Sequence, residues 1–512
     1  MKKSDRMELI FEVLLLIGLV CFVIAIFIIN LFHFNYRMNA DIASDTILGS
    51  LIWESGQVIP DTWYVANEVR IICTPNVSAL FYGLCHNMTL SMGLACCVMT
   101  VMILLSIFYF LKSIGIERKY RLIMEFTALM IPTGFIALEL SYLFTSYYAV
   151  HIVALFFTLA VYGEYMKTER VKRIRAVCCI LLAFILGVQG TRGILVIYGP
   201  LFGMEIIRNL YLFYIRQKKK KTDLLLSGWV ILLLTVSFIG TCFPISVGQS
   251  FSRNIRKGFN KLFTVVVPDM GRAIGFEETH LPGKICLLLL LLASCCVLIN
   301  ILIRMVKKQI IRTEEWIYLI VCSSPVVTAL IVAFTTVESS ERYYFILLFA
   351  IAYGVMLWHM KSGFKARMAS VGVICVLAVI NFSEVYFPAI SSQEPPVSDI
   401  EEAAEYLEEQ GYTKAYATFE NANTMTVLSG GAVRVAPVNS VSKMDICKWM
   451  TSTDWYVPGV PYEETTAYVI TEAEMEEFKK LQEEYEDAFQ YLIKIGKYYI
   501  YSADYNFSNL GQ

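Results

Sequence analysis

The sequence predicts an all-α polytopic membrane bundle of about 11 transmembrane helices, followed by a small extracytoplasmic α/β domain. Hydrophobic residues make up 57% of the 512 residues and charged residues only 17%, with a mean hydropathy of +0.58. These values exceed what a soluble globular chain of this length carries. Apolar runs recur from residue 9 to residue 388, and the composition then turns acidic and mixed. We therefore expect a multi-span membrane domain at 1–390 and a separate domain at 391–512.

The number of spans follows from the length of the apolar runs. A hydrocarbon core of about 30 Å needs roughly 20 apolar residues per helix. Two runs, 175–190 and 345–359, are short and fit half-helices or tilted continuations of a neighbour. The eleven predicted spans lie at 9–33, 90–111, 122–140, 147–166, 175–190, 193–214, 223–246, 284–306, 316–337, 345–359 and 368–388.

Lysine and arginine predict the orientation, because they stay preferentially in short cytoplasmic loops. Basic clusters occur in alternate loops, so the N-terminus is expected inside the cell. The first extracytoplasmic loop at 34–75, the segments 247–283 and 338–344, and everything after 389 are then outside. The clusters assigned to the inside are Lys2, Lys3 and Arg6; Lys112, Arg118, Lys119 and Arg121; Lys167, Arg170, Lys172, Arg173 and Arg175; Arg216 and Lys218 to Lys221; Arg304, Lys307, Lys308 and Arg312; Lys361, Lys365 and Arg367.

A polar Ser-Ser-Gln-Glu-Pro-Pro stretch at 391–396 ends the membrane part. From 389 onward the chain carries 21 Asp and Glu against 8 Lys and Arg, so this part is strongly acidic. Its periodicity predicts helices at 399–410 and 472–487 and strands at 414–418, 433–438, 466–470 and within 490–502. It is long enough to bury a core of its own.

The first outer loop contains the most informative polar segment of the chain, at 39–70. Asp41 and Asp45 are four residues apart, so in a helix they project from one face. Two carboxylates so placed can share a proton, which would make one of them a base, or hold a divalent cation. The same pattern equally fits an ordinary interfacial helix with its polar face in water.

Two more outer features carry arginine. Arg342 and Tyr343, in Glu-Ser-Ser-Glu-Arg-Tyr-Tyr, lie where a span begins, and a guanidinium there can bind a phosphate bidentately. Arg192 lies in the turn Gln-Gly-Thr-Arg-Gly, whose glycines allow close approach of the backbone. A charged turn beside a helix and a tight interhelical turn explain these residues as well.

Several classes of protein are disfavoured. No Cys/His cluster with zinc-ligand spacing occurs, so no metal site is predicted from motifs. No P-loop or glycine-rich dinucleotide motif follows a strand, and the inner loops are too short for a nucleotide-binding domain. The acidic C-terminal part disfavours attraction of nucleic acid.

The order of these features resembles the GT-C superfamily of polytopic glycosyltransferases, which includes protein mannosyltransferases and bacterial aminoarabinose transferases. The motifs that carry the resemblance are MNADIASD, IPDTWYVANEVR, QGTRG, ESSERYY and GYTKAYATFENANTMTVLSGGAVRVAPV. They are most similar to a group of little-characterised bacterial membrane proteins grouped with these enzymes. The resemblance implies a multi-pass protein of the bacterial plasma membrane.

The resemblance also implies a reaction. A sugar is transferred by direct, inverting displacement from a polyprenyl-phosphate donor to the hydroxyl of a cell-envelope glycan, lipid or protein. Asp41 or Asp45 would be the base, and Arg342, with Tyr343 and Arg192, would bind the donor phosphate. Trp63, Tyr64 and Glu68 would position the sugar. The adjacent acidic pair of several members is here spread over Asp41 and Asp45, which leaves the base and any divalent cation open.

Two alternatives come from other classes. A transporter or flippase of lipid-linked glycans would carry buried charges within its spans, and few such charges occur, among them Glu125, Glu139 and Glu205. A non-catalytic envelope assembly protein would use the acidic outer domain to bind a partner. Loss of activity on replacing Asp41 or Asp45 would separate the enzyme from both.

Overall fold

The structure is a computed structural model that divides into two compact units. We call them the helical unit, Met1–Phe27 with Cys97–Ile390, and the mixed unit, Ile28–Cys96 with Ser391–Gln512. The first outer loop, predicted within the membrane domain, thus lies in the same unit as the acidic C-terminal part. Some residues of the predicted features lie outside the described residues, namely Lys2, Arg216, Lys218 to Lys220, 244–251 and 393–396. The structure describes residues 3–170, 172–215, 221–243, 252–392, 398–456, 465–504 and 506–507.

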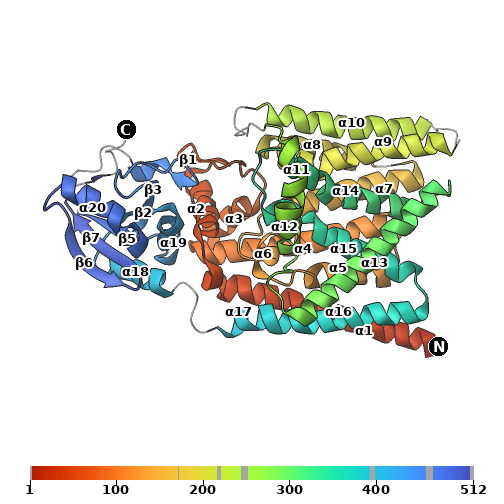
Figure 1. The fold of residues 1–512 in the computed structure, drawn as a ribbon, viewed down its shortest axis with the longest axis horizontal. Coiled ribbons are helices and arrows are strands. Elements are labelled where there is room, and N and C mark those ends of the chain that lie inside the picture. The colour runs from red at the N-terminus through yellow and green to blue at the C-terminus, as the bar shows by residue number, and fades with distance from the viewer. Residues whose placement is uncertain are drawn as a thin grey trace. The chain divides into compact units, whose positions relative to one another are not determined.

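Long apolar helices make up most of the helical unit. In Figure 1 they run roughly along one direction, whereas α11 and α12 cross it. Helices α1 and α4 have their remaining residues in the mixed unit. The elements are α1 (Lys3–Phe32), α4 (Met88–Ser113), α5 (Arg118–Met130), α6 (Phe135–Glu139), α7 (Ala149–Thr168), α8 (Arg173–Gln189), η2 (Ile194–Tyr198), α9 (Gly199–Tyr214), α10 (Lys221–Thr241), α11 (Ile255–Lys261), η3 (Leu262–Val266), α12 (Val267–Arg272), α13 (Leu281–Val306), α14 (Thr313–Ala333), η4 (Glu341–Tyr344), α15 (Ile346–Lys361), α16 (Phe364–Asn381), η5 (Phe382–Tyr386) and α17 (Phe387–Ser391).

Nine helical segments among the described residues are long and apolar enough to cross a membrane. They match nine of the eleven predicted spans, including the short run at 345–359, which continues back to Glu341. The other two correspond to α8, with 17 residues, and to the 122–140 run, which is divided into α5 and α6. The prediction of a multi-pass helical bundle followed by a small α/β domain is confirmed.

Side chains from distant parts of the chain hold the break between α5 and α6. In an apolar surrounding, backbone N–H and C=O groups of the break that had no partner would be costly. Asn381 of α16 donates from Nδ2 to the carbonyls of Met130 and Pro132, at 2.7 and 2.8 Å. Glu278 accepts from the backbone N–H of Phe135, the first residue of α6, at 2.9 Å. The break is therefore a specified feature of the bundle.

The mixed unit contains a five-stranded sheet in the order β3-β2-β5-β7-β6. Strands β3, β2 and β5 are parallel, and β7 and β6 are antiparallel additions. A second, two-stranded sheet pairs β1 with β4. The elements are η1 (Phe34–Arg37), α2 (Ala40–Ser55), β1 (Trp63–Tyr64), α3 (Thr74–Cys85), α18 (Ser398–Glu409), β2 (Lys414–Thr418), α19 (Phe419–Leu428), β3 (Arg434–Val438), β4 (Thr451–Ser452), η6 (Thr453–Tyr456), β5 (Thr466–Thr471), η7 (Glu472–Glu474), α20 (Met475–Glu484), β6 (Gln490–Ile495) and β7 (Tyr498–Ala503).

Helices cover both faces of the five-stranded sheet, because alternate strand residues point to opposite sides. Small and branched residues such as Ala415 and Val469 face α18 and α19 in one core. Aromatic residues on the other face, including Tyr468 and Tyr501, pack with Phe478 of α20 and with Phe489. Figure 1 shows the strands with α19 and α20 on opposite sides. Helix α19 was not predicted from the sequence.

Candidate functional site

Helix α2 presents the two predicted carboxylates. Asn39 caps its N-terminus by accepting from the backbone N–H of Ile42 at 3.0 Å, and Gly56 ends it in a left-handed conformation. Asp41 lies in the first turn, where the positive end of the helix dipole favours a carboxylate. Asp41 is half-buried, whereas Asp45 is only 1% exposed. The same helix thus places its two aspartates in different surroundings.

Asp45 forms a bidentate ion pair with Arg70, a residue not proposed from the sequence. Nε and Nη2 of Arg70 each lie 3.3 Å from one of the Asp45 carboxylate oxygens. Glu68 lies 3.7 Å from another guanidinium nitrogen of Arg70. A paired guanidinium favours the charged form of a carboxylate. Asp45 is therefore better suited to the role of a fixed negative charge than to the role of a base, which must take up a proton.

The backbone around Arg70 is fixed by the start of α3. Asn76 donates from Nδ2 to the Arg70 carbonyl at 3.1 Å and accepts from the backbone N–H of Cys73 at 2.9 Å. Burial raises the pKa of the Cys73 thiol to about 11, although the charge of Arg70 opposes the shift. Cys73 stays protonated at neutral pH, which makes it unsuitable as a nucleophile.

The structure separates the three residues predicted to position a sugar. Trp63 and Tyr64 form β1, paired with Ser452 and Thr451 of β4. Trp63 is 8% exposed, so in this structure its ring presents little surface for stacking, whereas Tyr64 is half-buried. Glu68 lies beside Arg70. Of these three residues, Glu68 is the one that shares a partner, Arg70, with the α2 carboxylate of Asp45.

In the helical unit, Arg192 and Arg342 meet two tyrosines that precede α7. The guanidinium carbon of Arg192 lies 4.1 Å from the ring centroid of Tyr148 and 5.4 Å from that of Tyr343. The guanidinium carbon of Arg342 lies 5.2 Å from the ring centroid of Tyr147. Such distances allow cation–π attraction. We call Arg192, Arg342, Tyr343, Tyr147 and Tyr148 the arginine–tyrosine cluster.

The cluster brings together the three residues predicted to bind a phosphate, although Arg192 and Arg342 are far apart in the sequence. Both arginines and Tyr343 are half-buried. Tyr148 also stacks on Phe345, with ring centroids 4.8 Å apart. These contacts with the aromatic rings restrain the positions of the two guanidinium groups. Two restrained guanidinium groups of this kind are suited to an anion such as a phosphate.

A strained turn places the two tyrosines. Phe144 and Ser146 both have positive φ, 58° and 44°, in a segment that is fully buried. Residues other than glycine rarely adopt this conformation, and such strain tends to occur at functional sites. Neither Tyr147 nor Tyr148 was proposed from the sequence. The TSYY run directly before an apolar span was the only local signal.

A third polar group lies within the spans of the helical unit. Arg208 pairs with Glu205 at 2.8 Å and with Asp223 at 2.9 Å. Tyr162 and Ser227 donate to the Glu205 carboxylate at 2.7 and 2.6 Å. Buried charges in spans can mark a transport path. Here the carboxylate oxygens of Glu205 are bound by neighbouring helices, as expected of a group that joins them.

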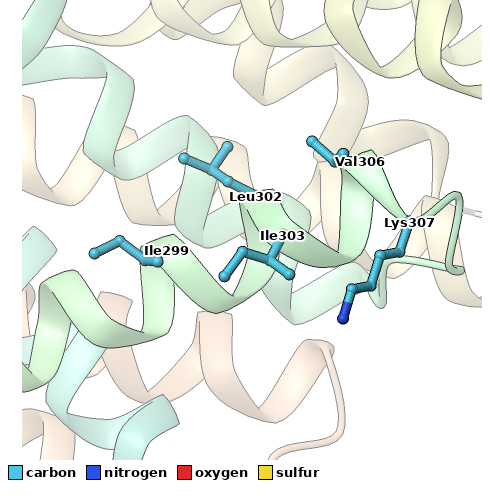
Figure 2. Close-up of a pocket in the computed structure, with 5 residues that line it drawn as sticks. All are labelled: Ile299, Leu302, Ile303, Val306 and Lys307. Carbon is cyan, nitrogen blue, oxygen red and sulfur yellow. The ribbon is translucent and has the colours of Figure 1, made fainter.

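One hollow of the described surface does not fit a catalytic role. Figure 2 shows this hollow, of about 280 Å³, on α13, lined by four apolar side chains, Ile299, Leu302, Ile303 and Val306, and by Lys307. It has no convergent polar groups, which a site for a sugar would need. Among the described residues no group of three or more His, Cys, Asp or Glu is placed to hold a metal ion.

Two solved structures are similar to this chain in fold. The structure of ArnT from Cupriavidus metallidurans in the apo state matches with a TM-score of 0.53 and 12% identity, over 97% of this chain and 98% of that one. ArnT from the same organism bound to undecaprenyl phosphate matches with a TM-score of 0.54 and 11% identity, over 95% and 97% of the two chains.

The chain has the fold of ArnT. The expected multi-pass helical bundle followed by a small α/β domain is shared with these structures over nearly the whole chain. No protein-family model matches the chain, and no curated protein matches it in sequence. At 11–12% identity the likeness to ArnT concerns the fold, and the roles of single residues stay predictions.

Proposed function

We propose that this protein is a membrane glycosyltransferase that transfers a sugar from a polyprenyl-phosphate donor to an acceptor hydroxyl on the extracytoplasmic face. The observation that carries the proposal is the arginine–tyrosine cluster, within a fold shared with ArnT. Two guanidinium groups restrained by aromatic rings suit the phosphate of such a donor. One of the matching ArnT structures is bound to undecaprenyl phosphate.

In this mechanism the base is a carboxylate of α2. Asp41 is the better candidate, because Asp45 is buried and paired with Arg70. Asp41 would take the proton of the acceptor hydroxyl as the oxygen attacks the anomeric carbon of the sugar. The bond from that carbon to the phosphate oxygen breaks, with inversion, and the electron pair leaves on the polyprenyl phosphate. Arg192 and Arg342 would stabilise the negative charge that develops on the phosphate.

The other roles are assigned by position. Asp45, Arg70 and Glu68 would form a fixed charged group beside the base, and Glu68 and Tyr64 are candidates for contacts with sugar hydroxyls. The acceptor would be a glycan, lipid or protein of the cell envelope. The alternation of basic clusters supports an N-terminus in the cytoplasm and a C-terminal domain outside the plasma membrane.

The test is turnover in liposomes that contain the purified protein and undecaprenyl-phosphate-linked sugars, with cell-envelope glycans, lipids and proteins added as acceptors. We expect release of undecaprenyl phosphate from at least one donor, and loss of that release in the Asp41→Asn variant. Glu54→Gln serves as the control, because Glu54 is an exposed carboxylate near the end of the same helix. Full turnover by Asp41→Asn would refute the assignment of the base. Absence of turnover with every lipid-linked sugar would refute the proposed function.

A further inference from the structure

Two cations converge on one aromatic ring where α4 ends. The guanidinium carbon of Arg121, on α5, lies 4.5 Å from the ring centroid of Phe108, and Nζ of Lys112 lies 5.9 Å from the same centroid. Both distances allow cation–π attraction, which holds the two positive charges beside a single ring. Lys112 lies in the last turn of α4, and Arg121 lies near the start of α5. We call Phe108, Lys112 and Arg121 the α4–α5 cluster.

The α4–α5 cluster has no carboxylate bound to it. Among the described residues, no ion pair or hydrogen bond joins Lys112 or Arg121 to an acid, and Nε of Arg121 is buried without a hydrogen-bond partner. Glu125, one turn further along α5, attracts Arg121 through space but is itself buried. By contrast Arg175, which lies over the next aromatic ring of α4, binds Glu164 at 2.6 Å. The α4–α5 cluster therefore keeps its capacity to bind an anion.

The start of α5 adds to the positive charge. Arg118 and Lys119 are its first two residues, and its first turn contains no acid. The N-terminal end of a helix carries a partial positive charge, so basic residues there are unfavourable unless an anion is nearby. Glu117, the N-cap residue, pairs with Lys119 at 3.6 Å. Arg118 is exposed and lies three residues before Arg121, which puts both guanidinium groups on the same side of the helix.

An exposed apolar stripe on α4 leads up to the cluster. Val101, Leu105 and Phe108 recur at a spacing of four and three residues, and Lys112 follows four residues later, so all four share one face. The three apolar residues are 39%, 55% and 38% exposed on a candidate span. Between Val101 and Phe108 the helix rises about 10 Å, which fits within one leaflet of a hydrocarbon core about 30 Å thick. An acyl chain can therefore lie along this stripe, with its headgroup at Lys112.

We propose that the α4–α5 cluster, together with Arg118, binds the phosphate of an anionic phospholipid whose acyl chain lies on the α4 stripe. A guanidinium donates two hydrogen bonds to phosphate oxygens, and lysine adds a point charge. A zwitterionic lipid carries the same phosphate, but its headgroup cation is repelled by the basic residues. The alternation of basic clusters assigns the site to the cytoplasmic leaflet. The inference does not depend on glycosyl transfer, because the cluster contains none of the residues assigned to catalysis.

The test uses Phe108→Trp, which makes the ring of the cluster a fluorescent reporter. Its emission is the difference between this variant and the wild-type protein in mixed micelles of detergent and phosphatidylcholine. A small, fixed fraction of the lipid is replaced by brominated phosphatidylglycerol or, in a matched sample, by brominated phosphatidylcholine, because bromine quenches tryptophan on contact. We expect phosphatidylglycerol to be enriched at the ring on the order of fivefold, which appears as stronger quenching at equal mole fraction.

Neutral variants identify the groups responsible. Adding Lys112→Gln and Arg121→Gln to Phe108→Trp should make the quenching by the two brominated lipids equal. Adding Lys307→Gln and Lys365→Gln instead removes two exposed lysines from other loops and should leave the preference unchanged. The native ring is tested by mass spectrometry of the intact protein from the same micelles. The wild-type protein should retain a phosphatidylglycerol that the Lys112→Gln, Arg121→Gln variant loses.

Three results would overturn the proposal. The first is equal quenching by the two lipids in Phe108→Trp together with equal retention of phosphatidylglycerol by the wild type and the neutral variant. The second is loss of the preference in the control with the two other lysines replaced, which would show attraction to the whole basic surface. The third is loss of the preference on adding inorganic phosphate but not chloride of the same ionic strength, which would assign the cluster to a soluble phosphate.

Discussion

At the scale of single residues, the two aspartates of α2 have different partners although the sequence treats them alike. Their spacing placed both on one helix face, and the helix is present. Burial and Arg70 then separate them. Arg70 is the only Lys or Arg between 38 and 75, which is the one signal that could have suggested it as a partner. Sequence spacing predicts which side chains share a face, but not how deeply each is buried.

The ion pair between Asp45 and Arg70 leads to a prediction about stability. Asp45→Asn leaves a largely buried guanidinium without its bidentate partner, so we expect unfolding to be easier by on the order of 2 kcal/mol. Thermal unfolding in detergent measures the effect. Asp41→Asn, in the first turn, should leave the unfolding temperature nearly unchanged while it abolishes transfer. Equal losses of stability in both variants would contradict the distinction between the two residues.

Arg192 allows a test of the phosphate-binding role. Arg192→Lys keeps the positive charge but loses the flat guanidinium that lies over Tyr148. We expect KM for the lipid-linked donor to rise on the order of tenfold, which is about 1.4 kcal/mol. Arg256→Lys, at an exposed position of α11, is the control. An unchanged KM in the Arg192 variant would remove this residue from the phosphate site.

At the scale of elements, helix packing in the helical unit depends on glycine at close crossings. A Cβ at Gly187 of α8 would lie 2.0 Å from the Ser237 carbonyl oxygen of α10, and one at Gly240 would lie 2.5 Å from the Phe184 carbonyl oxygen. The backbones of α8 and α10 are thus in direct contact, as is common for small residues in membranes. The 17-residue α8 is held by this crossing despite its short length.

The crossing predicts opposite effects for two glycines. Gly187→Ala forces the two backbones apart, and we expect a loss of about 1–3 kcal/mol in stability. Gly228→Ala on α10 has no atom within 4 Å of the added carbon and improves helix propensity, so stability should stay the same or rise slightly. Thermal unfolding of the two variants makes the comparison. A Gly187 variant as stable as the wild type would show that α8 and α10 do not pack this closely.

At the scale of the whole molecule, the first outer loop and the C-terminal part of the chain form one unit. Helix α19 packs on α2, where Asn423 donates from Nδ2 to the Ser44 hydroxyl at 2.6 Å and to the Met450 carbonyl at 3.0 Å. Strands β1 and β4 pair the same two parts of the chain. The C-terminal part is therefore a support for the α2 carboxylates.

This support can be weakened by one substitution. Asn423→Ala removes both hydrogen bonds of a fully buried amide, and we expect it to cost about 1–3 kcal/mol in stability. Because α2 is packed there, turnover should fall with the fraction of folded protein. Ser429→Ala, at the residue that directly follows α19, removes a hydroxyl that bonds to the Thr426 carbonyl and is a control for general effects on the domain. Turnover and stability that match the wild type would contradict the supporting role.

Acid sensitivity of the same unit follows from Glu477. Hydrogen bonds from the Ser440 and Ser442 hydroxyls lower the pKa of the Glu477 carboxyl below its usual value of 4.5. Its stabilising contribution is present above pH 4.5 and is lost as the pH falls through the lower pKa of the folded state. In Ser440→Ala with Ser442→Ala, the loss of stability as the pH falls below 4.5 should be smaller, as measured by unfolding at a series of pH values on both sides of 4.5.

The sequence by itself determined the class of the protein, nine of its eleven predicted spans and most of the α/β domain, because membrane insertion and strand formation follow local hydrophobicity and periodicity. Strands β2, β3 and β5 and helix α18 lie where the pattern predicts them. Only the tertiary structure decided which polar residues meet. Three pairs join segments that sequence periodicity does not connect. They are Asp45 with Arg70, Arg192 with Tyr148, and Ser44 with Asn423. Their proximity depends on how helices and strands pack over long sequence separations, and such packing leaves no periodic signal in one chain.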